Sequence, residues 1–195
     1  MDDAEAQRSN PHQNLVASAW VTRFAPLIRR TGRVLDVAAG HGRNARHLAA
    51  LGHSVLAVDR DAAALATLAG SAGIEARVAD LEAGAWPFAG IEFDGIVVTH
   101  YLHRPLFAAL LAALRPDGVL LYETFADGNA AFGKPSRPDF LLHPDELLQR
   151  FGASLRVVAF EQGQVALPFP AVIQRICATG SARAWPNGLP QSSTP

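Results

Sequence analysis

The stretch that decides the fold is Arg33-Val-Leu-Asp-Val-Ala-Ala-Gly-His-Gly-Arg-Asn-Ala45, which is soon followed by Ser54-Val-Leu-Ala-Val-Asp59. Its first residues form a short apolar run that is typical of a buried strand. Small residues then dominate positions 38–42, and residues 44–51 suit a helix. The pattern predicts a strand, a tight turn, a helix and a second strand.

The turn has the features of a ligand site. Gly40 and Gly42 allow backbone angles that are closed to other residues, and the helix that follows directs free N–H groups toward a ligand. Asp59 ends the second strand, and neighbouring parallel strands end at one crevice. We therefore expect the Asp59 carboxylate to accept hydrogen bonds from a ribose.

Two cofactor classes fit this geometry. The run Gly40-His-Gly42-Arg-Asn-Ala45 matches the dinucleotide pattern G-x-G-x-x-G/A, which keeps a nicotinamide or flavin cofactor open. Asp36 argues against a pyrophosphate, because it places a negative charge just before the turn. The same charge attracts the cationic end of S-adenosylmethionine, so this carboxylate favours that cofactor.

Several motifs, in order, resemble those of the Rossmann-like S-adenosylmethionine-dependent methyltransferases. Val34-Leu-Asp-Val-Ala-Ala-Gly-His-Gly42 resembles the family's first motif, and Ala57-Val-Asp59 resembles its second-strand acid. The later matches are Ala79-Asp80-Leu81-Glu82, Phe93-Asp-Gly-Ile-Val-Val-Thr-His100 and Leu114-Arg-Pro-Asp-Gly-Val-Leu-Leu-Tyr122. Within the family, the chain most resembles the compact bacterial tellurite-resistance-type group. Ala38 departs from the pattern, since many members have glycine there.

The resemblance implies a role for each matching position. It assigns the methionine end of the cofactor to Asp36, Ala38, Gly40 and Gly42. It assigns the ribose to Asp59, the adenine to Arg60, Asp80 and Leu81, and the surroundings of the sulfonium to Thr99 and His100. The expected product is S-adenosylhomocysteine.

The rest of the chain alternates between helices and strands, which indicates a parallel sheet. Helices are expected at 15–28, 44–51, 62–69, 105–114 and 144–151, and further strands at 76–78, 93–98, 118–123, 154–160 and 171–178. We therefore predict an α/β fold with a doubly wound, mostly parallel seven-stranded sheet, helices on both faces and a closing antiparallel strand pair. One domain should cover 14–180, between a flexible segment at 1–13 and a flexible tail at 181–195.

The segment after the fourth strand contains the candidate catalytic residues. His100, Tyr101 and His103 can orient or deprotonate an acceptor, and Arg104 can hold an acid group. The alternative is structural: His103 and Arg104 begin the next helix before Pro105, and Tyr101 packs over the cofactor.

A long connection at 124–140 follows the fifth strand. Long loops at a crevice are often lids, so we expect Phe132 and Phe140 to close an apolar wall above Tyr122. Arg137 could pair with an anionic substrate, and we include Tyr122 and Arg137 with Arg104 among the predicted substrate residues. The alternative is an ordinary surface loop.

Composition restricts the remaining choices. With 49% hydrophobic residues and a formal net charge of -1, the 195-residue chain can form a core and lacks the basic block of a nucleic-acid binder. One cysteine, Cys177, excludes an internal disulfide, and no His/Cys/carboxylate spacing indicates a metal. No apolar stretch is long enough to span a membrane, so the expected location is cytoplasmic.

These observations predict a small-molecule methyltransferase, with no nucleic-acid or membrane partner. Three alternatives stay open: a dinucleotide-dependent oxidoreductase, a nucleic-acid methyltransferase and a non-catalytic protein that binds the cofactor.

Overall fold

The computed structural model describes residues 16–184 and 188–190. The predicted flexible segment at 1–13 lies outside the described residues. The predicted tail at 181–195 is described only at 181–184 and 188–190.

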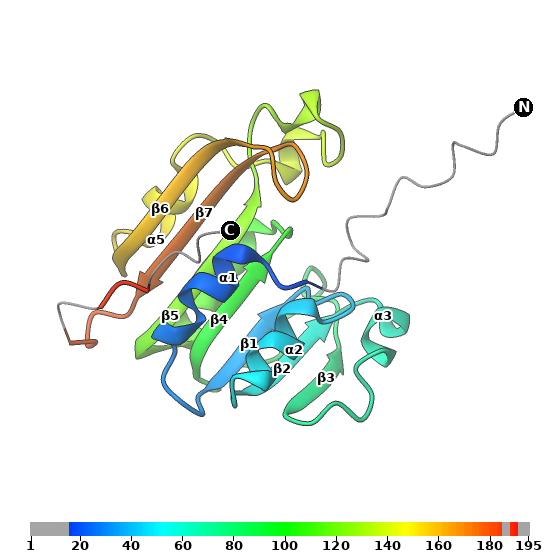
Figure 1. Cartoon of the computed structure of the whole chain (residues 1–195), viewed down its shortest axis with the longest axis vertical. Helices are drawn as coiled ribbons and strands as arrows, with labels where there is room; N and C mark the ends of the chain where they lie inside the picture. Colours follow the sequence, from blue (N-terminus) through cyan, green and yellow to red (C-terminus); the bar gives the residue numbers. More distant parts are fainter. Residues whose placement is uncertain (1–15, 185–187, 191–195) are drawn as a thin grey trace, which may run out of the picture.

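Seven strands form one twisted sheet (Figure 1). They are β1 Arg33–Val37, β2 Ser54–Asp59, β3 Ile74–Val78, β4 Phe93–Thr99, β5 Leu114–Phe125, β6 Arg156–Val165 and β7 Ala171–Thr179. Their order is β3-β2-β1-β4-β5-β7-β6. All neighbours from β3 to β5 pair in parallel, whereas β7 is antiparallel to both β5 and β6. This topology confirms the predicted fold class.

Helices cover both faces of the sheet (Figure 1). The α-helices are α1 Ala19–Phe24, α2 Arg43–Ala50, α3 Ala62–Ala66, α4 Phe107–Ala113 and α5 Glu146–Phe151, and short 3₁₀ helices are η2 Ala25–Leu27, η3 Arg104–Leu106, η4 Asn129–Ala131 and η5 Pro138–Phe140. Trp20, Phe24 and Leu48 belong to the core on the α1 and α2 face, whereas Phe107 and Phe151 belong to the core on the opposite face. The central strand β4 is buried along its whole length between the two layers.

The first helix is shorter than the predicted 15–28 span. Ser18 caps α1, because its hydroxyl oxygen accepts hydrogen bonds from the backbone N–H groups of Trp20 and Val21 at 3.1 and 3.4 Å. The chain then tightens into η2, which contains Pro26, and becomes extended at Ile28. Serine is a favoured N-cap residue, so the sequence did contain a signal for the later start.

The other predicted elements keep their places but change their ends. The helix predicted at 62–69 is α3, which ends at Ala66, and the helix predicted at 105–114 is divided into η3 and α4. The strand predicted at 118–123 extends from Leu114 to Phe125. Pairing of Leu114 with Phe93 lengthens its start, and pairing of Phe125 with Ile173 lengthens its end. Long-range pairing therefore determines these strand boundaries.

Candidate active site

The strand order reverses between β1 and β4, and the carboxyl ends of strands frame a crevice at such a reversal. A pocket of about 340 Å³ lies there, lined by residues 38–41, 43, 59–61, 64, 79–82 and 99–101, and we call it the turn pocket. It brings together the predicted cofactor residues Ala38, Gly40, Asp59, Arg60, Asp80, Leu81, Thr99 and His100, with Tyr101 beside them. The other two, Asp36 and Gly42, are buried and do not line it.

The turn after β1 has left-handed backbone geometry. Gly42 has φ 73°, and a Cβ built there would lie 2.4 Å from Leu68 Cδ2, so only glycine fits. Gly40 has φ 53° with open space where its Cβ would be. Ala38 also has φ 53°, which places an L side chain in the region that favours glycine. The departure from the family pattern at this position therefore strains the backbone.

Asp59 is tied to the turn. One carboxylate oxygen accepts a hydrogen bond from the Gly40 backbone N–H at 2.8 Å, and the other accepts from the Asp61 N–H at 2.9 Å. These bonds hold the carboxylate at the end of β2 on the wall of the turn pocket. The remaining lone pairs of the two oxygens can accept the hydroxyl groups of a ribose.

Asp36 is the most unusual charge in the molecule. It is fully buried in β1, and neither carboxylate oxygen has a hydrogen bond of ordinary geometry. Burial raises its pKa from 3.8 to about 7, although a weak interaction with the Ala45 backbone N–H and the positive charge of Arg43 oppose the rise. A buried carboxyl with so few polar contacts is unfavourable in the free protein and favours a nearby positively charged ligand group.

Arg43 is a half-buried cation at the first position of α2. It forms no ion pair within the part of the chain that the structure describes, and burial lowers its pKa against the opposing charges of Glu123 and Asp36. Arg43 was not among the residues predicted to bind the cofactor. Its position directly after the glycine turn was the available signal for a role in binding.

A network of buried polar groups connects α1 with the ends of β4 and β5. The Ser18 N–H donates to Asn44 Oδ1 at 3.0 Å, and Asn44 Nδ2 donates to Thr99 Oγ1 at 2.9 Å. The Ser18 hydroxyl donates to Glu123 Oε1 at 2.8 Å, and Arg175 Nη1 donates to Glu123 Oε2 at 3.2 Å. The sequence interpretation did not find this network, because its members are far apart along the chain.

His100 lies where three pockets meet. Its φ of 55° is rare for a residue with a side chain, and its backbone N–H donates to the Glu123 carbonyl at 2.9 Å. Arg43 Nη2 is 3.5 Å from His100 Nδ1. Because a guanidinium can only donate, this contact favours an unprotonated Nδ1 and a proton on Nε2.

Tyr101 also lines the turn pocket. Burial raises the pKa of its phenol, and the negative charge of Glu82, which accepts a hydrogen bond from it, raises the pKa further. The phenol therefore stays protonated at neutral pH. Tyr101 can donate a hydrogen bond but is unsuited to the predicted role of a base.

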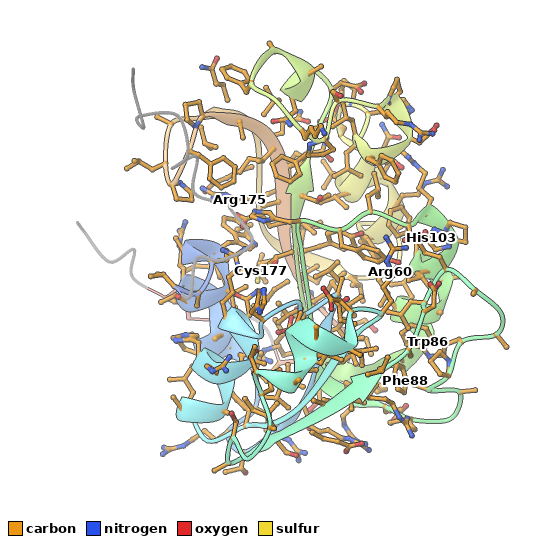
Figure 2. The ribbon with its side chains drawn as sticks, turned by 90° about the vertical axis from the view of Figure 1, so that its right-hand side faces the viewer. Arg60, Trp86, Phe88, His103, Arg175 and Cys177 are labelled. Carbon is orange, nitrogen blue, oxygen red and sulfur yellow. The ribbon has the colours of Figure 1, made fainter. Side chains whose placement is uncertain are left out.

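Two further pockets flank His100. The hairpin pocket, of about 410 Å³, is lined by residues 16–19, 43, 100, 123, 125, 165, 167–169, 171, 173 and 175. The loop pocket, of about 660 Å³, is lined by residues 60, 82, 100–102, 124–125, 134–137 and 140. Figure 2 shows Arg175 of the hairpin pocket and Arg60 of the loop pocket on opposite sides of the central strands. An acceptor could therefore reach His100 from either side.

Three predicted residues contact other parts of the fold or lie outside the pockets. Arg104 forms an ion pair with Glu146 at 2.7 Å and donates to two backbone carbonyls, so four of its five N–H donors are engaged. Tyr122 is 1% exposed and its hydroxyl donates to the Tyr101 carbonyl, which leaves no surface for a substrate. His103 precedes η3 and lines none of the three pockets among the described residues. His103 and Arg104 stand at the start of η3, before Pro105, as the structural alternative predicted, and their catalytic and substrate roles stay predictions.

Arg137 and Phe140 line the loop pocket, within the connection that was predicted to be a lid. Arg137 lies over the Phe140 ring at 5.3 Å and pairs with exposed Asp139 at 3.0 Å. Its role in substrate binding and the lid both stay predictions.

Two features are absent from the described residues. Residues 16–184 and 188–190 contain no cluster of three or more His, Cys, Asp or Glu side chains placed to hold a metal. In the same residues, no helix has the length and apolar character needed to cross a membrane.

Known proteins resemble this chain in fold more than in sequence. Residues 34–118 match the family model of a methyltransferase domain. No curated protein is similar enough in sequence to match the chain. The crystal structure of TehB from Haemophilus influenzae is 19% identical, with a TM-score of 0.71 over 85% of this chain and 63% of that one. The chain thus spans less than two thirds of the length of that TehB.

Two other solved structures are similar. A TehB-like S-adenosylmethionine-dependent methyltransferase from Corynebacterium glutamicum is 18% identical, with a TM-score of 0.62, and the match covers 84% of this chain and 88% of that one. The glycopeptide N-methyltransferase MtfA, in complex with S-adenosylmethionine, is 20% identical, with a TM-score of 0.59 and coverage of 83% and 93%. The family match shows a methyltransferase domain at residues 34–118, and the solved structures show that the chain has the fold of the Rossmann-like, or class I, S-adenosylmethionine-dependent methyltransferases.

Proposed function

We propose that this protein transfers the methyl group of S-adenosylmethionine to a small-molecule acceptor. The observation that carries the proposal is the pair of opposite charges beside the turn: the buried carboxyl of Asp36, and the guanidinium of Arg43, which forms no ion pair among the described residues. The amino-acid end of the cofactor has one ammonium and one carboxylate. Asp36 attracts the ammonium, and Arg43 pairs with the carboxylate.

The turn pocket supplies the rest of the cofactor site. Asp59 accepts the ribose hydroxyls, Arg60 flanks the adenine, and Asp80 and Leu81 bind it through a hydrogen bond and packing. Thr99 and His100 lie on the wall nearest the sulfonium. A pyrophosphate would add negative charge beside Asp36, so a dinucleotide fits this site less well.

When bound, S-adenosylmethionine supplies an activated methyl group for an in-line displacement, so position and desolvation of the acceptor dominate the catalysis. His100 is the side chain that the turn, hairpin and loop pockets share. Its imidazole ring can form a hydrogen bond with an acceptor atom and orient it. We assign His100 an orienting role at the point of transfer.

Calorimetric titration with S-adenosylmethionine, S-adenosylhomocysteine and NAD(H) tests the cofactor. We expect heat from the two adenosyl compounds alone, and Asp59→Ala should weaken their affinity by roughly 10–150-fold, as for loss of hydrogen bonds to a charged group. Asp139→Ala is the matched control, because this exposed carboxylate pairs with Arg137 and does not line the turn pocket. Binding of NAD(H) alone, or unchanged affinity in Asp59→Ala, would contradict the assignment.

The alternative of a non-catalytic binding protein is tested at His100. We expect His100→Ala to keep its affinity for S-adenosylhomocysteine within about threefold and to lower turnover more than tenfold. Radiolabelled methyl transfer to a panel of phenols, thiols and small acids measures the turnover. A wild-type protein that binds the cofactor and transfers methyl to nothing in the panel would favour the binding protein.

A further inference from the structure

We propose that the hairpin pocket holds the methyl acceptor, and that the acceptor is a neutral, planar aromatic molecule with a hydroxyl group. This inference rests on the proposed function and specifies its substrate class. It also chooses between the two pockets that reach His100 from opposite sides of the sheet.

The hairpin pocket opens onto the site of transfer. It shares Arg43 and His100 with the turn pocket. It is also lined by Glu123 of β5, which pairs with Thr99 in the neighbouring strand β4. Its volume of about 410 Å³ is within the range of small-molecule sites. A molecule in this pocket would therefore present its inner end to His100.

The walls of the pocket are aromatic and aliphatic. Phe125, Ala171 and Ile173 form a small core of their own, separate from the two main cores, and Val165 and Phe169 pack against it. The His100 ring is 5.0 Å from the Phe125 ring and 6.0 Å from the Phe169 ring, measured between centroids. Phe125 and Phe169 are nearly parallel, with 28° between their planes. Such surfaces favour a flat ring.

The rim of the pocket exposes apolar side chains to solvent. Leu167, in the turn between β6 and β7, is 83% exposed, and Val16 is 70% exposed. Both line the pocket. Exposed apolar residues beside a concave apolar site are typical of a place where an apolar ligand enters.

The charges in the pocket disfavour an anion. Arg175 already pairs with Glu123 at 3.2 Å and with Glu161 at 2.6 Å, and the proposed function assigns Arg43 to the cofactor. The loop pocket differs, because Arg60, Lys134 and Arg137 line it with Glu82 as the acid. An anionic acceptor would therefore prefer the loop pocket, and a neutral one prefers the hairpin pocket.

The transfer is balanced without a further reactant. The bond between the methyl carbon and sulfur breaks with its electron pair left on sulfur, a bond from the acceptor oxygen to that carbon forms, and the acceptor proton passes to solvent. A phenol is neutral near pH 7 and carries such a proton, which is why the proposal names this group.

Two fluorescent probes of the same shape test the charge preference. In the presence of saturating S-adenosylhomocysteine, 2-naphthol should bind at least tenfold more tightly than 2-naphthoate, which is an anion at neutral pH. Phe169→Ala should weaken binding of 2-naphthol at least fivefold, because this ring forms one wall of the hairpin pocket. Phe140→Ala, which removes a phenylalanine from the loop pocket, is the matched control and should change the affinity for 2-naphthol less than twofold.

A second variant distinguishes a loss of binding from a loss of folding. Leu167→Asp changes an exposed rim residue and should weaken 2-naphthol binding at least threefold with an unchanged melting temperature. Stronger binding of 2-naphthoate, or a loss confined to Phe140→Ala, would overturn the inference in favour of an anion in the loop pocket. Binding of S-adenosylhomocysteine without binding of 2-naphthol would also overturn it and leave the proposed function standing. Failure to bind S-adenosylhomocysteine would instead overturn the proposed function and the inference with it.

Discussion

The turn pocket and the hairpin pocket meet at His100 but are built in opposite ways. The turn pocket is polar and comes from short segments that directly follow β1, β2, β3 and β4. The hairpin pocket is largely apolar and combines the residues before α1 with β5 and the β6–β7 turn. The difference indicates that cofactor recognition is encoded locally, whereas acceptor recognition depends on segments brought together by the whole sheet.

The largest expected effect is at Glu123, because this residue of the hairpin pocket belongs to the buried polar network that reaches Thr99 of the turn pocket. Glu123→Ala leaves Ser18 and Arg175 without a buried partner, and we expect the free energy of unfolding to fall by about 3 kcal/mol. Urea unfolding measures the change. Glu161→Ala is the matched control, since Glu161 pairs with the same arginine at the surface and should contribute at most about 1 kcal/mol.

Equal losses for Glu123→Ala and Glu161→Ala would show that the buried network does not join the pockets. The turn pocket and the hairpin pocket would then be energetically independent of each other.

The second effect concerns the amino-acid end of the cofactor. Arg43→Met should weaken the binding of S-adenosylhomocysteine by roughly 10–150-fold, because the ion pair between Arg43 and the carboxylate of this ligand is lost. The affinity for 5′-methylthioadenosine, which lacks the amino-acid end, should stay the same. Calorimetric titration measures the affinity of the wild type and the variant for both nucleosides. An equal loss of affinity for the two nucleosides would show that Arg43 does not bind the carboxylate.

The third effect is a pH dependence from Asp36. Burial raises its folded pKa to about 7, so its contribution to stability is full below pH 3.8 and is lost as the pH rises through about 7. The cofactor ammonium favours the ionised carboxylate. We therefore expect affinity for S-adenosylhomocysteine to rise with pH up to about 7, by at most about tenfold per pH unit.

Asp36→Asn tests the origin of that dependence. The variant should bind S-adenosylhomocysteine more weakly at pH 7.5, with an affinity that is nearly flat between pH 5.5 and 7.5. It should also lose less stability than the wild type as the pH rises over this range. A pH profile that persists in the variant would assign it to another group.

The smallest effect is in the turn itself. Ala38→Gly removes an L side chain from a left-handed backbone conformation but adds conformational freedom to the unfolded chain. These terms oppose each other, so we expect the free energy of unfolding to rise by no more than about 1 kcal/mol. Thermal unfolding measures it. A clear loss of stability would show that the Ala38 methyl packs favourably against the pocket wall.

The sequence by itself determined the cofactor half of this protein. The strand, turn, helix and acid from β1 to β2 are local, because glycine angles, apolar runs and the position of Asp59 at a strand end all act within about one supersecondary unit. The same local rules placed most helices and strands. They also identified most of the residues that line the turn pocket.

Only the tertiary structure decided the other half. Arg104 was predicted to meet a substrate but meets Glu146, 42 residues away, and Tyr122 is covered by packing. The ends of β5 depend on pairing with β4 and β7, and the polar network joins Ser18 to Glu123 across 105 positions. Whether a charged side chain faces a ligand or a partner depends on what the fold places beside it, and no local pattern contains that information.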